Sequence, residues 1–157
     1  MMAAMRLRLI AVGKLRSAPI AALCEEFALR LQPLIPCEVQ EVRAADGRAP
    51  EHAMAEEAER ILRLLPAAEP LWLLERTGDT LSSPQLSAKL GELGTTGISR
   101  LTLVVAGTYG AAPTLLERAT FRWSLSPLTF LHEWARALVL EQLYRAAKIA
   151  RNEPYHH

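Results

Sequence analysis

Short apolar runs alternate with segments of helical periodicity along the whole of this chain. Residues 6–12 alternate and then turn continuously apolar, and residues 101–106 are almost entirely apolar. Runs of this kind are typical of buried strands in a parallel sheet. Residues 20–31 and 51–65 instead carry apolar side chains every three or four positions, which predicts amphipathic helices. The alternation predicts an α/β fold, with a mainly parallel sheet flanked by helices.

Weaker signals place the remaining elements. Thr77-Gly78-Asp79 predicts a turn, Ser83 followed by Pro84 predicts a helix start, and Thr129 is a plausible N-cap for the last helix. The further elements predicted are strands at 37–42 and 71–74, and helices at 86–93, 112–119 and 131–150.

Length and composition limit the class of protein. A chain of 157 residues, 50% hydrophobic and 22% charged, fits one globular domain over 1–157, with residues 1–4 as a flexible extension. No apolar run approaches the ~20 residues of a membrane span, and no secretory signal opens the chain, so we expect a soluble, cytoplasmic protein. Cys24 and Cys37 fall in apolar-periodic segments and predict core residues, not a metal site or a disulfide framework.

The near-neutral total charge hides an uneven distribution. Residues 1–16 carry four basic groups and no acidic ones, residues 17–97 carry seven against thirteen, and residues 98–157 carry seven against four. If the two ends meet in space, they form a basic face suited to a phosphate backbone. Scattered, solvated charges are the alternative that this pattern leaves open.

Ligands of parallel α/β sheets bind beyond the carboxyl ends of the strands. Three loops lie there by sequence: after Leu74, after Ala106, and at residues 125–131. Gly107 and Gly110 would let the backbone approach a ligand, although an ordinary turn explains them equally well. The sequence therefore indicates where a ligand would bind, without identifying it.

The last helix and the chain end gather cationic and aromatic groups. His132 and Arg136 are four residues apart in the first turns of the predicted helix, a geometry that suits a phosphate or a carboxylate. Tyr155 and His156 could stack on a base or contact phosphate. A pair of solvated surface residues and a frayed tail are the alternatives.

At these residues the chain resembles the RlmH family of the SPOUT methyltransferase superfamily, which methylates pseudouridine in large-subunit ribosomal RNA. The resemblance extends from Met5 to His156. The segments that carry it are Leu9 to Lys14, Leu73 to Gly78, Leu81 to Ser83, Val105 to Gly110, Ser124 to Phe130, Glu141 to Ala146 and Pro154 to His156.

The resemblance implies a methyltransferase that uses S-adenosyl-L-methionine to methylate N3 of a pseudouridine in 23S rRNA of the ribosome or its large subunit. It also implies a C-terminal trefoil knot, a homodimer whose partner subunit helps to form the RNA site, and no metal or membrane. By the same likeness, His132, Arg136, Tyr155 and His156 are candidate catalytic residues. The implied cofactor-binding residues are Leu74, Gly107, Ser126, Pro127, Leu128, Thr129, Phe130 and Leu131.

Three positions depart from the family pattern. Ala106 stands where the family has glycine, Leu131 where it has proline, and His157 where it often has a basic residue. The first two lie beside the implied cofactor site, where losing proline frees a backbone N–H and relaxes the turn into the last helix. A methyltransferase for another RNA, such as tRNA, and a catalytically silent RNA-binding protein of the same fold therefore remain as alternatives.

For a uracil-type N3, negative charge spreads to the carbonyl oxygens as the proton leaves, and a nearby arginine or imidazolium would stabilise that charge. We expect His132 and Arg136 to provide that environment, with Tyr155 positioning the base. No side chain stands out as the proton acceptor.

Overall fold

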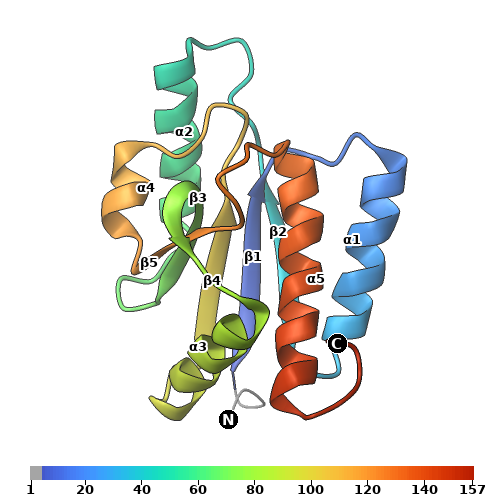
Figure 1. Ribbon diagram of the computed structural model, residues 1–157. Helices are drawn as coiled ribbons and strands as arrows, with labels where there is room; N and C mark the ends of the chain where they lie inside the picture. The colour runs from blue at the N-terminus through green and yellow to red at the C-terminus, as the bar shows by residue number, and fades with distance from the viewer. Residues whose placement is uncertain (1–4) are drawn as a thin grey trace.

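A computed structural model describes residues 5–157, so the expected extension at 1–4 lies outside the described part. In chain order the elements are β1 (Arg6–Val12), α1 (Ala18–Leu31), β2 (Cys37–Val42), α2 (Pro50–Leu62), β3 (Leu71–Thr80), α3 (Ser83–Thr95), β4 (Arg100–Val105), α4 (Pro113–Arg118), β5 (Phe121–Ser124) and α5 (His132–Ala150) (Figure 1).

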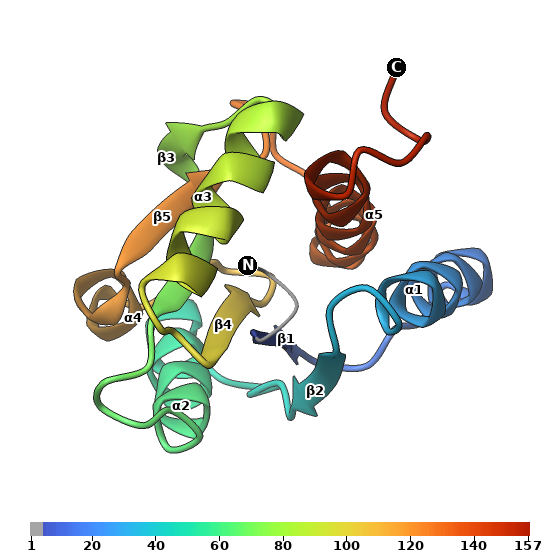
Figure 2. The ribbon, with the colours of Figure 1, turned by 90° about the horizontal axis from the view of Figure 1, so that it is seen from below.

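The five strands form one parallel sheet in the order β2-β1-β4-β3-β5. Helices α1, α5 and α3 cover one face and helices α2 and α4 cover the other, as Figure 2 shows along the sheet. The expected α/β class, with a mainly parallel sheet between helices, is confirmed. The trefoil knot stays a prediction.

Side-chain alternation along the central strands divides the core into two halves. In β1, Leu7 and Leu9 point to the face covered by α1, α3 and α5, whereas Ile10 and Val12 point to the face of α2 and α4. Successive strand residues face opposite sides, so a strand that is buried on both faces is predominantly apolar. This double burial explains the continuous apolar runs of the sequence.

Several local predictions need correction. β5 was not predicted, because its four residues, Phe-Arg-Trp-Ser, are too few and too mixed to show a period. The expected turn at 77–79 lies inside β3, where Trp123 pairs with both Leu74 and Asp79 and residues 75–78 bulge out. The N-cap of α3 is Ser82, not Ser83, and its side chain forms a reciprocal capping box with Gln85.

At the amino end of the sheet lies a polar cluster that is buried. Glu69 accepts hydrogen bonds at 2.7 Å from both Arg8 Nη2 and Thr102 Oγ1, and it also pairs with Arg100. Burial acts to raise the pKa of Glu69, but the hydrogen bonds from Arg100 and Thr102 and the charges of Arg8 and Arg100 outweigh it, so the pKa is lowered. This cluster fixes the end of the sheet opposite to the predicted ligand loops.

We expect the Glu69 cluster to make stability depend on acid. A carboxyl whose pKa is lower in the folded than in the unfolded state stabilises the protein. This contribution is fully present when the pH lies above the unfolded-state pKa, about 4.3, and it is lost as the pH falls through the folded-state pKa. Denaturant unfolding from pH 7 downward should show wild type losing more stability below about pH 4.3 than Glu69→Gln. Glu26→Gln, which removes one exposed partner of Arg30, serves as the control and should change stability by less than about 0.5 kcal/mol at pH 7. Equal acid sensitivity of wild type and Glu69→Gln would contradict this assignment.

Two kinds of feature are absent from residues 5–157, a membrane-spanning helix and a metal-binding cluster. No helix among residues 5–157 is long and apolar enough to cross a bilayer. Over the same residues, no group of three or more His, Cys, Asp or Glu side chains is placed to hold a metal ion. Cys24 is buried, and Cys37 is half-buried against the core, which agrees with their expected structural role.

Candidate functional site

The bulge of β3 after Leu74 and the turn after β4 lie at the same edge of the sheet. The two strands are parallel neighbours with Leu73 opposite Val104, the last pair between them, so Leu74 lies beside the turn that begins at Gly107. That turn is closed by a hydrogen bond from the Gly110 N–H to the Gly107 carbonyl at 3.0 Å. The chain therefore brings together two of the three segments implicated by sequence.

The third segment, residues 125–131, joins this edge through β5. The Ser124 hydroxyl donates to the Arg76 carbonyl at 2.8 Å, which ties the end of β5 to the bulge after Leu74. Ser126 Oγ accepts from the Leu128 N–H at 3.1 Å and shapes the turn. All three segments predicted to bind a ligand thus lie along one edge of the sheet.

Residues 125–131 expose both apolar surface and unused backbone donors. The N–H groups of Ser126, Thr129 and Phe130 donate to no other protein group within residues 5–157. Leu128 and Leu131 are 69% and 68% exposed, and Phe130 is 38% exposed. Exposed apolar side chains beside free backbone donors are the lining that binds nucleoside-like ligands.

Gly107 is favoured by close packing, not by a positive φ. A Cβ at this position would lie 2.9 Å from Glu57 Oε1 and 3.1 Å from Val12 Cγ1. Glu57 is itself buried and accepts a hydrogen bond from the Ala45 N–H at 3.0 Å. A larger residue at the turn after β4 would therefore require the Glu57 carboxylate and Val12 to shift.

The two candidate residues at the start of α5 do not share an exposed face. His132 is half-buried, whereas Arg136 is 2% exposed. Arg136 Nη1 pairs with Glu41 Oε2 at 2.7 Å and Nη2 donates to the Gly13 carbonyl at 3.0 Å, while Nε has no partner in the described part of the chain. The side of α5 that carries Arg136 packs inward, so of these two candidate residues only His132 reaches the surface.

Glu133 makes a contact that sequence reasoning missed. Its Oε1 accepts hydrogen bonds from the backbone N–H groups of Arg16, at 2.6 Å, and Ser17, at 3.2 Å. These two hydrogen bonds lower the pKa of Glu133. The first turn of α5 is thereby attached to the start of α1. α5 begins after Leu131, which has no side-chain cap, so Thr129 is not its N-cap.

The chain end folds back on α5 and does not fray. The Tyr155 hydroxyl donates to Glu141 Oε1 at 2.9 Å, and its ring lies 4.8 Å from the Tyr144 ring and 4.6 Å from the Arg145 guanidinium. His156 Nδ1 lies 3.4 Å from Arg145. Burial, together with the Glu141 contact, raises the pKa of Tyr155. The tail is a defined part of the structure.

Within one chain, however, this tail lies away from His132. Glu141 follows His132 by nine residues along α5, which corresponds to about 13 Å at the α-helical rise. Tyr155 sits at Glu141, so one protomer does not bring His132 and Tyr155 to the same nucleotide-sized site.

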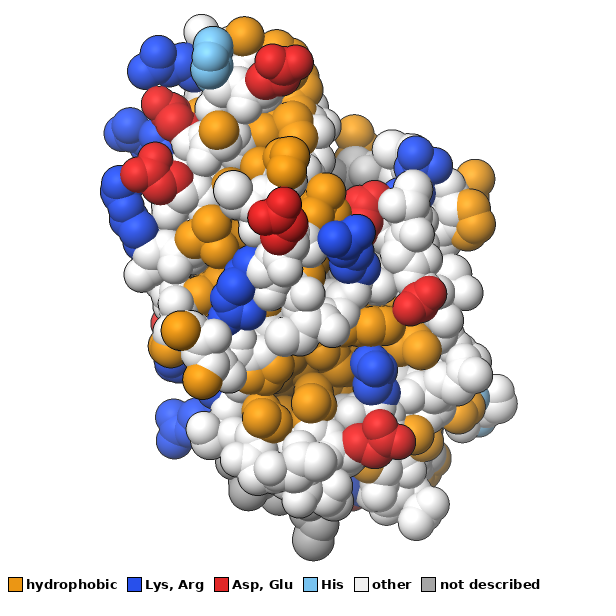
Figure 3. Space-filling model, turned by 90° about the vertical axis from the view of Figure 1, so that its left-hand side faces the viewer, with side chains coloured by type: hydrophobic (Ala, Val, Ile, Leu, Met, Phe, Trp, Pro, Cys, Tyr) orange, Lys and Arg blue, Asp and Glu red, His pale blue; other side chains and the backbone are white. Residues whose placement is uncertain are grey.

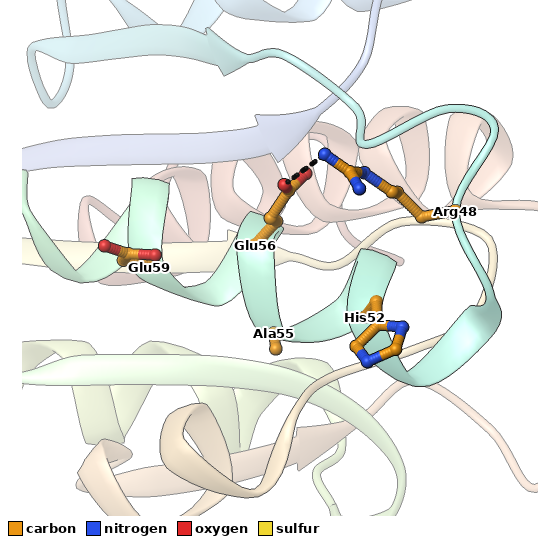
Figure 4. A pocket seen from close by; sticks show the side chains of 5 residues that line it. All are labelled: Arg48, His52, Ala55, Glu56 and Glu59. Carbon is orange, nitrogen blue, oxygen red and sulfur yellow. Dashed lines mark ion pairs between the residues drawn. The ribbon is translucent and has the colours of Figure 1, made fainter.

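Two surface hollows lie elsewhere, on α2 and α4. One of about 310 Å³ is formed by α2 and the residue Arg48 before it, where Arg48 pairs with Glu56 at 3.4 Å beside His52 (Figure 4). The other, of about 600 Å³, contains Leu62, Ala112 and Pro113 and belongs to the face on which Figure 3 shows hydrophobic side chains gathered between charged ones. The larger hollow reaches the loop after β4 only at Ala112, and neither hollow includes Leu74, Gly107 or a residue of 125–131.

Comparison with known proteins identifies relatives along the whole chain. A family model described as "Predicted SPOUT methyltransferase" matches residues 5–156. Proteins named "Ribosomal RNA large subunit methyltransferase H" are similar: that of Pelobacter propionicus is 39% identical, covering 98% of this chain and 100% of the relative. That of Rubrobacter xylanophilus is 43% identical, covering 96% and 98%.

Solved structures resemble the fold at low sequence identity. A probable methyltransferase from Bordetella pertussis Tohama I has a TM-score of 0.52 at 16% identity, covering 92% of this chain and 98% of that one. A probable methylase family protein from Haemophilus influenzae Rd KW20 has a TM-score of 0.51 at 13% identity, covering 100% of this chain and 72% of that one. These two likenesses concern the fold alone.

Proposed function

Because this chain belongs to the SPOUT methyltransferase family, together with the ribosomal RNA large subunit methyltransferases H, we propose that it methylates N3 of a pseudouridine in 23S rRNA. The methyl donor is S-adenosyl-L-methionine, and the substrate is the ribosome or its large subunit in the cytoplasm. One observation carries the proposal: Leu74, Gly107 and residues 125–131 lie at one edge of the sheet in a chain that matches the family over residues 5–156.

The chemistry of this edge fits the proposed cofactor. The free N–H groups of Ser126, Thr129 and Phe130 would donate hydrogen bonds to the polar edge of an adenosine. The exposed side chains of Leu128 and Leu131 would pack against its apolar faces. Leu74, Gly107 and Pro127 would complete the binding residues. When bound, S-adenosyl-L-methionine supplies a methyl group that its sulfonium already activates.

The protein then has to align the acceptor and accommodate the loss of its proton. As the N3 atom gains the methyl group and loses its proton, negative charge spreads to the base carbonyl oxygens. We propose that His132, which follows residues 125–131 at the start of α5, donates a hydrogen bond to that charge. Arg136 is buried, so we propose that it supports the site through Gly13 and does not contact the base.

A homodimer completes the proposed site. Leu128, Phe130, Leu131 and Trp134 expose apolar surface within seven consecutive residues, and Trp134 is 48% exposed on α5. A second copy would cover part of this surface and could bring its own Tyr155 and His156 to His132 of the first. The separation of Tyr155 from His132 within one chain supports this arrangement.

The test of the function is methyl transfer. Purified ribosomes and isolated large subunits from a strain lacking the modification are incubated with the protein and labelled S-adenosyl-L-methionine, and nucleoside mass mapping locates the product. We expect N3-methylpseudouridine in 23S rRNA and no label in tRNA. Label in tRNA alone, or cofactor binding without transfer to any RNA, would overturn the proposal.

Tyr155 is expected to act through its ring. Stacking on a base is worth about 1–3 kcal/mol, so Tyr155→Ala should slow single-turnover methylation by about 5-fold to 150-fold, and Tyr155→Phe should slow it much less. Tyr155→Phe is the matched control, because it removes the hydroxyl contact to Glu141 and leaves both the ring and the Glu141–Arg145 pair. Equal losses in Tyr155→Phe and Tyr155→Ala would show that the hydroxyl contact matters and stacking does not.

Mixed dimers test the shared site. If Tyr155 serves the partner's site, a dimer of one His132→Ala chain and one Tyr155→Ala chain has one doubly altered site and one intact site. It should keep about half of the wild-type rate. Loss of activity at both sites of this mixed dimer would mean that each chain uses its own tail.

A further inference from the structure

A fourth segment lies at the same edge of the sheet, between β1 and α1. Residues 13–17 follow β1, whose neighbour β4 leads into Gly107, so the segment begins beside one of the proposed cofactor loops. Gly13 opens it with a φ of +82°, and its N–H donates to the Val42 carbonyl at 2.8 Å. A positive φ at this point favours glycine.

Two side chains of α5 hold this segment in place. Arg136 Nη2 donates to the Gly13 carbonyl at 3.0 Å, and Glu133 Oε1 accepts from the N–H groups of Arg16 and Ser17. Ser17 also caps α1 through its side chain. A segment held at both ends and capped at its exit keeps a defined course beside His132.

The segment presents two unpaired cations. Lys14 and Arg16 are exposed, and neither side chain takes part in an ion pair or hydrogen bond within the described residues. The cations in the C-terminal half of α5 are paired instead. Arg145 pairs with Glu141 at 2.5 Å, and Lys148 pairs with Glu153 at 2.6 Å. Lys14 and Arg16 are therefore free to meet an external anion.

Only a small part of the basic face expected from the charge distribution lies at this edge of the sheet. Of the four cations in residues 1–16, Arg8 is buried in the Glu69 cluster and Arg6 lies at the opposite end of β1. Lys14 and Arg16 alone of these four reach the edge that carries His132.

We infer that Lys14 and Arg16 bind the phosphate backbone of the substrate RNA next to the target nucleotide. The inference rests on the proposed function and adds a surface to it. An RNA strand that places a base at His132 passes its flanking phosphates over the adjoining segments, and residues 13–17 adjoin His132 through Glu133. Because the backbone of this segment is already fixed, binding phosphate has to order only the two side chains.

Salt dependence of ribosome binding is the direct test. Each phosphate contact in a single strand contributes about 0.7 to the slope of log K against log salt, so Lys14→Ala/Arg16→Ala should make the slope shallower by about 1.4. Over the tenfold range from about 1 M to about 0.1 M salt, a slope difference of about 1.4 corresponds to about 25-fold weaker binding at about 0.1 M. The affinity for S-adenosyl-L-methionine, measured by calorimetry, should not change.

Arg6→Ala is the matched control, because Arg6 is an exposed arginine at the other end of the same strand. It should leave the salt slope and both affinities unchanged. An unchanged slope in Lys14→Ala/Arg16→Ala would overturn the inference, and so would a parallel loss of cofactor affinity, which would assign the segment to the cofactor. Both substituted side chains are exposed, so we expect the fold to persist, and circular dichroism checks it.

Failure of this inference can be told apart from failure of the proposed function. If the wild-type protein methylates 23S rRNA while the double variant keeps the wild-type salt slope, the phosphate contacts alone are wrong. If the wild-type protein binds ribosomes with the expected salt dependence but methylates no rRNA, the proposed activity is wrong and the contacts stand.

Discussion

Replacing Gly78 with alanine is expected to lower the free energy of unfolding by about 3 kcal/mol. A Cβ at Gly78 would lie 2.7 Å from the carbonyl carbon of Arg122 and still closer to its oxygen. These are backbone atoms of β5, so relief requires β3 and β5 to separate. Because β5 leads directly into residues 125–131, we also expect weaker binding of S-adenosyl-L-methionine. Denaturant unfolding and calorimetry measure the two effects.

Gly91 provides the comparison for this substitution. It lies inside α3, and a Cβ there would meet no atom within 4 Å. Gly91→Ala should therefore stabilise the protein by about 0.5–1 kcal/mol, since alanine is the better helix former. If Gly78→Ala proves as stable as Gly91→Ala, the close approach of β3 to β5 at this bulge is not real.

Arg136→Ala is expected to be the second most damaging substitution, with a loss of about 3 kcal/mol in unfolding free energy. It removes a guanidinium that is 2% exposed and leaves the Gly13 carbonyl and the Glu41 carboxylate without their partner. Methylation should fall as well, because residues 13–17 lose one of their two attachments to α5. Chemical denaturation and single-turnover methylation under conditions where the variant is folded measure these losses.

Arg136→Lys separates position from charge. A lysine keeps the charge but lacks the planar fork that reaches Glu41 and Gly13 together, so it should restore only part of the stability. If Arg136 acts through residues 13–17, Arg136→Ala should also make the salt slope of ribosome binding shallower, which a simple loss of stability would not do. Arg63→Ala, at an exposed pair with Glu59, should cost less than about 0.5 kcal/mol and is the control.

The strands of the sheet were predictable where burial on both faces left a continuous apolar run, as at residues 101–106. β5 was not, because Arg122 and Ser124 interrupt its apolar residues and only its pairing with β3 makes it a strand. The bulge in β3 escaped prediction for a similar reason. Thr77-Gly78-Asp79 has turn chemistry, but the pairing of Asp79 with Trp123 continues the strand beyond it.

The location of the site was predictable to the extent that it follows from the direction of the strands. The turn after β4 and residues 125–131 follow the carboxyl ends of parallel strands and open at the same edge, where the bulge of β3 also lies. The attachment of Arg16 and Ser17 to Glu133 was not predictable, because it joins residues 117 and 116 positions apart. Spacing along α5 placed His132 and Arg136 near one another, but it could not tell which side of the helix the sheet would cover.

The attachment of residues 13–17 to Glu133 and Arg136 also bears on synthesis of the protein. Residues 13–17 leave the ribosome early, yet both side chains that hold them belong to the last helix. In addition, β1 pairs with one of its two neighbouring strands only after β4 has been synthesised. In a nascent chain the segment proposed to bind RNA therefore has no settled course until the final helix has emerged. The protein should become competent only after release, and should not act on the ribosome that is still translating it.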